Sequence, residues 1–326
     1  MPIVPWPFLP GFLYRQLLVT PPKPSARFDD KTVIVTGANV GLGLEAARHF
    51  GRLGAARVIL GVRDLDKGDA AKASIDDTLG RDPSPIHVWH LDLASYDSVR
   101  AFAARADKQL DRLDVLCENA GIATQTFRFA ERDESTMTVN VTSPFLLALL
   151  LLPKMKATAG RCNTHATITF TGHQHNFVEL AERHEPDVLD ALSDRSRADM
   201  ATRYFVSKLV GLLCVREMAQ RAGSAGPVVI NCLNPGFCHS QLGREAGWYL
   251  YVMALLLARP AEVGGRMIVG AAAGGPGTHG KYISDGAVAE PSAFVRSEEG
   301  GRVQRRVWDE LVARLEGVVP GVAANL

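Results

Sequence analysis

Tyr204 and Lys208 stand four residues apart in the segment Tyr-Phe-Val-Ser-Lys, which opens an apolar stretch with helical spacing. In a helix, residues at positions i and i+4 lie on the same face. A lysine ammonium beside a phenol favours the phenolate and lowers the tyrosine pKa, so the phenol can exchange a proton near neutral pH. Such a pair suits acid–base chemistry on a substrate oxygen. The spacing alone is common, so a second motif is needed before it indicates a function.

The second motif is a glycine-rich turn, Thr-Gly-Ala-Asn-Val-Gly-Leu-Gly at 36–43. It lies between a β-branched run at 31–36 and a stretch at 44–53 whose apolar residues repeat with helical period. Glycines here allow a tight turn and let the backbone approach a pyrophosphate, which the helix N-terminus stabilises. The strand before and the helix after favour dinucleotide binding over a plain loop. The residues placed to bind it are Gly37, Asn39, Gly41, Leu42 and Gly43.

The end of the second predicted strand indicates which dinucleotide binds. An NAD site places an acidic residue there to hold the ribose 2′-hydroxyl, whereas an NADP site uses arginine. This chain has Val62 and then Arg63, with the first acid at Asp64. Because a guanidinium can make a forked contact with a 2′-phosphate, we expect NADPH/NADP⁺ at Arg63, against the alternative of a plain surface arginine.

Short apolar runs alternate with helical stretches from Lys31 onward. Strands are predicted at 31–36, 57–62, 86–93, 113–117, 166–171, 228–233 and 281–284. Helices are predicted at 44–53, 64–79, 96–110, 134–152, 204–221, 260–273 and 302–315, with Pro144 kinking or bounding the fourth and Pro153 closing its apolar run. This alternation indicates an α/β fold, a Rossmann-type doubly wound parallel sheet in a single domain. We expect a Pro-rich, extended N-terminal arm at 1–30 packed on an NADP-binding domain at 31–326.

These motifs together make the sequence similar to the classical short-chain dehydrogenase/reductase family, over about Lys31 to Gly286. The matching motifs are TGANVGLG at 36–43, Asp92, ENAG at 118–121, Asn140, YFVSK at 204–208, and NPG at 234–236 with Ser240 beyond. Within the family, the segments 56–68 and 176–203 resemble retinol-dehydrogenase-like members from filamentous fungi. Many such members serve secondary-metabolite pathways, so the resemblance implies that context here.

The resemblance implies a catalytic role for three residues. Tyr204 would pass a proton to or from the substrate oxygen while a hydride moves to or from nicotinamide. Lys208 would bind the nicotinamide ribose and tune Tyr204. Asn140 would anchor a water molecule in the proton relay.

The resemblance also implies how the cofactor is held. Gly37, Gly41 and Gly43 would line the pyrophosphate. Asp92 would hold the adenine amino group, and Asn119 would border the adenosine side. The turn at Pro235 and Gly236, and Ser240, which stands where the family usually has a threonine on the nicotinamide carboxamide, would complete the cofactor site.

The sequence departs from the family at the end of the fifth strand, where a catalytic serine is usual. The segment here reads Phe-Thr-Gly-His-Gln-His at 170–175, which puts Gly172 in the serine position. Losing one such oxyanion donor typically costs about 10²–10³ in rate. Thr171 or His173 could supply the donor from one residue away, or the substrate or a water could fill the space. Alternatively, the enzyme has left hydride transfer and acts as an isomerase, cyclase or dehydratase, or the glycine is a tolerated change in a slow reductase. A non-catalytic NADP-binding protein is the third possibility.

Glu118 is a smaller departure, because the family motif often begins with asparagine. A carboxylate beside cofactor phosphates is unfavourable unless it points away, so we expect Glu118 to face solvent or a helix N-terminus.

Two segments are expected to shape the substrate site. The stretch 176–203 is longer than a simple connection and is expected to fold over the site. The stretch 237–258 follows the NPG turn and contains an apolar run that includes Trp248, so we expect a helical substrate lid there. A subunit interface, a membrane-contacting surface and a buried core helix are the alternatives for this run. A lid of this kind predicts a lipophilic carbonyl or alcohol substrate, such as a polyketide or terpenoid, with Thr171, Gly172, His173 and Trp248 contacting it.

Composition limits the remaining possibilities. The 326 residues carry 36 Lys+Arg against 35 Asp+Glu, a net charge of +1, so no overall attraction to nucleic acid is expected. Five scattered cysteines without a Cys-x-x-Cys pair predict buried free thiols, a reducing compartment and no metal site. The sequence has neither an uninterrupted run of about 18 apolar residues nor the features of a signal peptide. We expect a cytoplasmic protein without a transmembrane segment, with peripheral membrane contact and a homo-oligomer left open.

Overall fold

The computed structural model describes residues 9–174, 178–223, 226–240, 242 and 253–326. An eight-stranded sheet runs through its centre in the order β10-β9-β8-β7-β4-β1-β2-β3. The strands are β1 (Thr32–Thr36), β2 (Arg57–Val62), β3 (Ile86–His90), β4 (Val115–Glu118), β7 (Ala166–Thr171), β8 (Val228–Asn234), β9 (Tyr282–Ser284) and β10 (Ala287–Ala289). All neighbouring strands pair in parallel except β9 and β10. A short hairpin, β5 (Phe129–Ala130) and β6 (Asp133–Glu134), stands apart. The doubly wound parallel sheet predicted from the sequence is confirmed.

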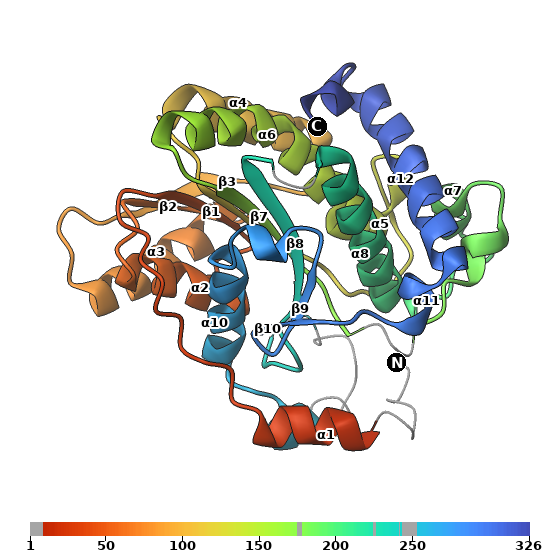
Figure 1. The fold of residues 1–326 in the computed structure, drawn as a ribbon, viewed down its shortest axis with the longest axis horizontal. Helices are drawn as coiled ribbons and strands as arrows, with labels where there is room; N and C mark the ends of the chain where they lie inside the picture. Colours follow the sequence, from red (N-terminus) through yellow and green to blue (C-terminus); the bar gives the residue numbers. More distant parts are fainter. Residues whose placement is uncertain (1–8, 175–177, 224–225, 241, 243–252) are drawn as a thin grey trace.

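Helices cover both faces of this sheet. The α-helices are α1 (Leu9–Leu18), α2 (Gly41–Arg52), α3 (Leu65–Leu79), α4 (Tyr96–Gln109), α5 (Ser135–Met137), α6 (Ser143–Cys162), α7 (Val188–Leu192), α8 (Arg203–Ala222), α10 (Ala261–Ala272), α11 (Ala293–Arg296) and α12 (Glu298–Val318). The shorter turns are a π-helix, η2 (Thr138–Thr142), and the 3₁₀ helices η3 (Ala181–His184), η5 (Pro276–Thr278) and η6 (Val322–Asn325). In Figure 1, α2, α3 and α10 lie on one face of the sheet, and α4, α6, α8 and α12 lie on the other.

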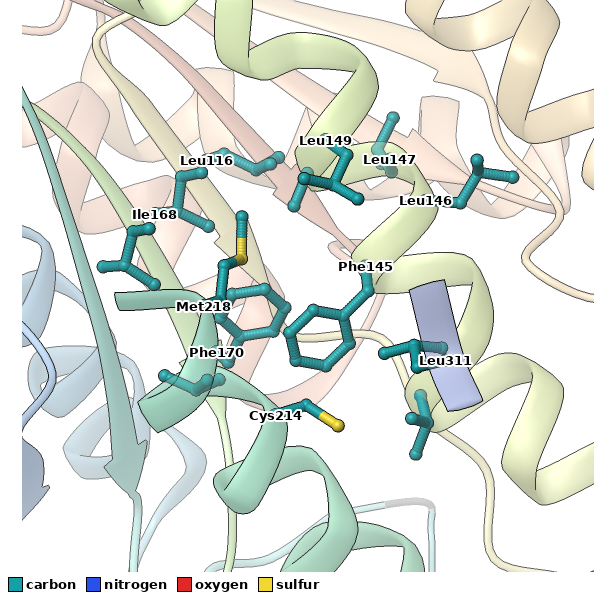
Figure 2. Packing of buried hydrophobic residues seen from close by; sticks show 14 of the residues in the cluster. Leu116, Phe145, Leu146, Leu147, Leu149, Ile168, Phe170, Cys214, Met218 and Leu311 are labelled. Atoms are coloured by element: carbon teal, nitrogen blue, oxygen red, sulfur yellow. The ribbon is translucent and has the colours of Figure 1, made fainter. Parts of the chain in front are cut away.

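The buried apolar side chains form two clusters, and the larger cluster packs around the elements that carry the candidate site. Phe145 of α6 stacks on Phe170 of β7, with ring centroids 4.7 Å apart, and both rings are buried. Figure 2 shows these rings packed with Met218 and Cys214 of α8 and with Ile168 of the sheet. Burial of this many apolar side chains holds α8 tightly against the carboxyl end of β7. The first turn of α8 is thereby placed beside the residues that follow β7.

Several elements differ in their bounds from the sequence prediction: β3 ends at His90 and not at Leu93, and α12 runs over Glu298–Val318 and not over 302–315. Helix α6 continues through Pro153 to Cys162, although we placed its end at Leu152. Proline costs one helical hydrogen bond, but Met155 and Ala159 beyond it are buried and hold the helix together. The edge strand β10 was also missed. Asp285 and Gly286, with φ of 53° and 82°, form the two-residue turn that joins it to β9.

The N-terminal stretch contains a helix where we expected extended chain. Helix α1 is bound to the body through the buried Gln16, whose side-chain amide donates to the carbonyls of Phe237 and Leu257 at 2.6 and 2.7 Å. In Figure 1 it lies below α10, at the end of the molecule where β9 and β10 turn. The arm therefore packs on the body as expected, and the domain boundary at residue 30 stays a prediction.

Candidate active site

A cavity of about 1500 Å³ opens at the carboxyl edge of the sheet. The residues that follow six successive strands in space all line it: Gly37 after β1, Arg63 after β2, Asp92 after β3, Asn119 after β4, Gly172 after β7 and Pro235 after β8. In doubly wound sheets, ligands bind in the crevice outside the carboxyl ends of the strands, at the point where the strand order reverses. Tyr204, Lys208, His173 and Thr171 line the same cavity. The cofactor and catalytic residues predicted from the sequence are thus brought together.

The glycine-rich turn forms one wall of the cavity. Gly37, Asn39, Gly41 and Leu42 line it, and Gly41, at φ 61°, begins α2. Gly43 is not among the lining residues, although we expected it there. A Cβ at Gly43 would lie 2.5 Å from Nδ2 of Asn119 and 2.6 Å from the carbonyl oxygen of Gly37. The third glycine thus lets helix and strand approach closely, and the turn leaves open the backbone cradle that a pyrophosphate needs.

The far end of this wall carries positive charge. Arg63 is exposed and lines the cavity with Lys67 and Asp64. Asp64 is the N-cap of α3: its Oδ1 accepts from the Lys67 backbone N–H at 3.2 Å, and its Oδ2 lies 2.8 Å from Nζ of Lys67. The hydrogen bond to Lys67 lowers the pKa of Asp64 below its ordinary value. Asp64, the first acid after β2, therefore caps α3, and Arg63 remains as an exposed arginine that lines the cavity.

Asp92 and Asn119 line the cavity at the ends of β3 and β4. Asp92 accepts from the backbone N–H of Ala94 at 2.9 Å through Oδ1. The side-chain amide of Asn119 donates to the carbonyl of Thr36 at 2.9 Å, which ties the end of β4 to the end of β1. Both residues are anchored and both line the cavity, where a cofactor's adenosine would lie.

Tyr204 and Lys208 lie on one face of α8, as their spacing predicts. Nζ of Lys208 is 5.8 Å from the centroid of the Tyr204 ring and donates to the carbonyl of Thr171 at 2.7 Å. Burial raises the pKa of the Tyr204 phenol and lowers the pKa of Lys208 to about 8. The expected lowering of the Tyr204 pKa by Lys208 is therefore wrong, because the ammonium is held by Thr171 and desolvation dominates. Tyr204 therefore stays protonated at neutral pH.

Asn140 lies behind this pair, in the π-helical turn η2. Its Nδ2 donates to the carbonyl of Ile122 at 2.9 Å and to Oγ of Ser207 at 3.0 Å, and its Oδ1 accepts from the Ile122 backbone N–H at 2.8 Å. The side chain thus fastens the loop after β4 to α8. Its predicted part in a water relay stays a prediction.

Position 172 is packed in a way that the sequence did not reveal. The backbone N–H of Gly172 donates to the carbonyl of Leu233 at 2.7 Å. A Cβ at Gly172 would lie 2.7 Å from Sγ of Cys232 and 3.1 Å from that same carbonyl oxygen. The thiol of Cys232 therefore occupies the space beside the position where the family has its serine.

Two neighbours of Gly172 are candidate donors to a substrate oxygen. The hydroxyl of Thr171 is buried and has no hydrogen-bond partner among the described residues. The ring of His173 lies edge-on to Tyr204, with centroids 5.6 Å apart, and its Nδ1 is 2.8 Å from the carbonyl oxygen of Gln174. Both Thr171 and His173 line the cavity.

Glu118 is buried, so the expectation that it faces solvent or a helix end is wrong. Its Oε2 accepts from Oγ1 of Thr36 at 3.2 Å, and its Oε1 has no hydrogen-bond partner among the described residues. Burial raises the pKa of Glu118 to about 8, against a smaller lowering by Thr36. The side chain lines a separate cavity of about 20 Å³ with Lys208, Asn140 and Cys232. A protonated glutamic acid therefore lies behind the active site at neutral pH.

The expected substrate lid is only partly within the described residues. Phe237, Leu242, Met253 and Leu257 line the cavity with Gly236 and Ser240, and 253–257 is helical. Trp248 lies outside the described residues, so its predicted substrate contact is not tested.

The stretch 176–203 behaves differently from our expectation. Its described part packs against α12: the backbone N–H groups of Val188 and Leu189 donate to Glu310 at 2.9 and 3.1 Å, and Leu192 is buried. No residue of 178–203 lines the cavity. The prediction that this stretch folds over the site is wrong for its described part.

Helix α1 supplies a wall of the cavity that sequence reasoning missed. Phe12, Arg15 and Gln16, at helical spacing, line the cavity, and the Phe12 ring lies 6.4 Å from that of Phe237. The repeat at i, i+3 and i+4 was the available signal, but the prolines around it favoured extended chain.

The described residues also give findings on metal binding and on membrane-spanning helices. No group of three or more His, Cys, Asp or Glu side chains there could hold a metal ion. One stretch, Ser135–Cys162, is long and apolar enough to cross a membrane, with mean hydropathy 1.6, but 89% of that window is buried in the protein. By burial it is a core helix.

Known proteins resemble this chain over nearly its whole length. The short chain dehydrogenase family matches residues 31–176. A short chain dehydrogenase/reductase of Cryptosporiopsis sp. is 46% identical over 97% of this chain and 99% of its own. A short-chain dehydrogenase of Penicillium roqueforti is 40% identical over 97% of this chain and 85% of its own.

A solved structure agrees with the fold. The short chain dehydrogenase from Escherichia coli CFT073 complexed with NADPH has a TM-score of 0.60 at 23% identity, over 80% of this chain and 99% of its own. The two fungal relatives place the chain in the short-chain dehydrogenase/reductase family, whose members are enzymes that bind a nicotinamide cofactor.

Proposed function

We propose that this protein is an NADPH-dependent oxidoreductase, a carbonyl reductase or alcohol dehydrogenase, acting on a lipophilic metabolite such as a polyketide or terpenoid of secondary metabolism. The observation that carries the proposal is the convergence of two sites on one cavity. The glycine-rich turn at 36–43 forms one wall, and Tyr204 with Lys208 forms another.

The choice of NADPH rests on the residues after β2. Arg63 and Lys67 line the cavity where the ribose of a dinucleotide on the glycine turn would lie, and the neighbouring Asp64 is taken up as a helix cap. A guanidinium and an ammonium there attract a 2′-phosphate, which NADH lacks. The NADPH bound to the E. coli protein of the same fold is consistent with this choice.

The chemistry divides between the cofactor and the chain. When bound, the cofactor supplies or accepts the hydride. Tyr204 donates its phenol proton to the substrate oxygen, and the phenol is protonated at neutral pH, which is the form that carbonyl reduction requires. Lys208, reaching the cavity beside Tyr204, holds the nicotinamide ribose, and its pKa of about 8 lets it exchange a proton with the phenol.

A lipophilic substrate follows from the rest of the lining. Apolar side chains from four separate parts of the chain line the cavity that Tyr204 also lines: Phe12, Val139, Phe205, Phe237, Leu242, Met253 and Leu257. Cavities of this kind select by buried apolar area, with a few polar groups fixing orientation. Thr171 and His173 are the polar groups that would orient the substrate oxygen.

A second candidate has its own observation. Position 172 is glycine and the thiol of Cys232 fills the space beside it, so no serine hydroxyl is available there to polarise a carbonyl. A redox-silent enzyme that uses Tyr204 for proton transfer, an isomerase, cyclase or dehydratase, fits that packing.

The proposal is tested with Tyr204→Phe, which removes the phenol proton and keeps the ring. Turnover should fall by about 10²–10⁴ with NADPH affinity unchanged, whereas Tyr14→Phe, a change at an exposed tyrosine, should behave as wild type. Unaltered turnover in Tyr204→Phe would refute the proposal.

A further inference from the structure

Exposed apolar side chains of this protein are concentrated beside the cavity. Eight large hydrophobic residues of the described chain are exposed, and five of them belong to α1 or to the helical segment 253–257. These five, which we call the mouth patch, are 58–73% exposed: Tyr14, Leu17, Leu18, Leu255 and Leu256. Single exposed leucines are ordinary, but a cluster on adjoining helices marks a surface that binds something.

The two helices that carry the mouth patch are apolar on both sides. On α1, Phe12 and Gln16 face the cavity, while Tyr14 and Leu17 lie on the opposite side and face solvent. On 253–257 the same division holds, since Met253 and Leu257 line the cavity and Leu255 and Leu256 are exposed. The mouth patch is therefore one helix thickness from the proposed substrate space.

The patch is held firmly to the body. Gln16 joins the two helices by donating to the carbonyl of Leu257 at 2.7 Å, and it also binds the carbonyl of Phe237. The buried Arg259 donates to the carbonyl of Val19 at 3.0 Å and to that of Arg15. An apolar surface anchored by buried polar groups is a built feature of the fold.

Charge around the patch is positive. Residues 9–28 contain Arg15, Lys23 and Arg27 and no acidic residue. Arg27 pairs with Asp29 at 2.6 Å, and Asp285, which lies 3.9 Å from Arg15, is already paired with Arg259 at 2.8 Å. Arg15 on α1 and the exposed Lys23, five residues after the helix ends, thus give the segment 9–28 a net positive charge.

This charge favours one occupant over another. In a symmetric contact between two copies the same surface meets itself, so one positively charged surface would lie against another. An anionic lipid surface instead meets leucines and a tyrosine with acyl chains and the basic groups with headgroups.

We propose that the mouth patch docks this protein on an anionic membrane surface, with α1 and 253–257 inserted among the headgroups, so that a lipophilic substrate enters the cavity from the bilayer. The lipophilic substrate rests on the proposed function; the docking itself does not.

The test is flotation of the purified full chain with vesicles of phosphatidylcholine, with and without phosphatidylserine. The patch variants are Leu17→Glu with Leu18→Glu, and Leu255→Glu with Leu256→Glu. The matched controls are Leu65→Glu and Val288→Glu, which place the same charge at exposed apolar residues elsewhere. Wild type and controls should float with phosphatidylserine vesicles, less in high salt, and each patch variant should bind about tenfold more weakly or worse.

Three results would overturn the docking proposal. Wild type could fail to float with either vesicle, or controls could lose binding as much as the patch variants. Sedimentation could also show that the patch variants convert a dimer to a monomer while vesicle binding is absent, which would make the patch an interface between copies. NADPH affinity and thermal midpoint of the patch variants should match wild type, so loss of fold is recognised separately. Hydride transfer to a water-soluble carbonyl, measured without vesicles, tests the proposed function independently.

Discussion

The thiol of Cys232 fills the space where a side chain at position 172 would begin: a Cβ on Gly172 would lie 2.7 Å from Sγ of Cys232. Cys232 is on β8 and Gly172 follows β7, so the two positions are neighbours only because these strands pair. The sequence shows a glycine where the family has serine, and the structure gives the packing that accompanies it.

This packing predicts that the serine cannot be restored alone. Gly172→Ser should lower the free energy of unfolding by about 1–3 kcal/mol, because the new Cβ overlaps Cys232 Sγ and approaches the carbonyl of Leu233. Combined with Cys232→Ala, the serine should fit and raise the rate of carbonyl reduction above wild type, by up to about 10². Urea unfolding and steady-state kinetics measure the two effects. Cys232→Ala by itself is the control, and a single Gly172→Ser as stable as wild type would contradict the packing argument.

Gly43→Ala should weaken dinucleotide binding. Its Cβ would come within 2.6 Å of the Gly37 carbonyl and of the Asn119 amide, so the turn must open and the cradle is lost. Titration calorimetry with NADPH should show at least a tenfold loss, about 1.4 kcal/mol or more. Gly160→Ala adds the same methyl in a helix where no atom lies within 4 Å, and its NADPH affinity should equal that of wild type.

Arg63→Ala should weaken NADPH much more than NADH. Losing a charge-assisted contact to the 2′-phosphate is worth about 1.5–3 kcal/mol, a factor of roughly 10–100 in Kd. Fluorescence titration of the reduced cofactors gives both constants. Arg57→Ala, at the start of β2, is the control away from the ribose end. Equal losses for NADPH and NADH would show that Arg63 does not read the phosphate.

The contribution of Glu118 to the free energy of unfolding should fall as pH rises from about 4.5 to 8. In the unfolded chain Glu118 ionises near its ordinary pKa of 4.5, whereas burial keeps it protonated up to about 8 in the folded protein. The folded state therefore holds one more proton across this range, and each pH unit costs up to about 1.4 kcal/mol. Glu118→Gln removes this dependence, so the difference between variant and wild type in denaturant-unfolding free energy should grow with pH and level off above 8. A difference independent of pH would mean that Glu118 is ionised in the folded protein.

Much of this architecture was predictable from the sequence, because buried parallel strands such as Thr32–Thr36 are continuous β-branched runs. The helical spacing of Tyr204 and Lys208, and the glycine turn between strand and helix, predicted the two walls of the cavity. Local patterns of this kind need no knowledge of distant residues.

What sequence reasoning missed depends on contacts between distant residues. The environment of Glu118 is set by Thr36 on the neighbouring strand, and that of Gly172 by Cys232. The pKa of Tyr204 is governed by burial, which the nearby lysine did not reveal. Helix α1 was missed because the prolines of the N-terminal stretch favoured extended chain, although Phe12, Arg15 and Gln16 repeat with helical spacing.

The central claim is that this fold transfers a hydride although position 172 is glycine. NADPH deuterated at the transferable position should be incubated with the purified protein and a set of lipophilic carbonyl compounds, and the products analysed by mass spectrometry. We expect deuterium on the former carbonyl carbon of one class of product, and we expect Tyr204→Phe to lose formation of that product. A product formed without deuterium, or formed equally well without NADPH, would contradict hydride transfer and favour proton-transfer chemistry on the same scaffold.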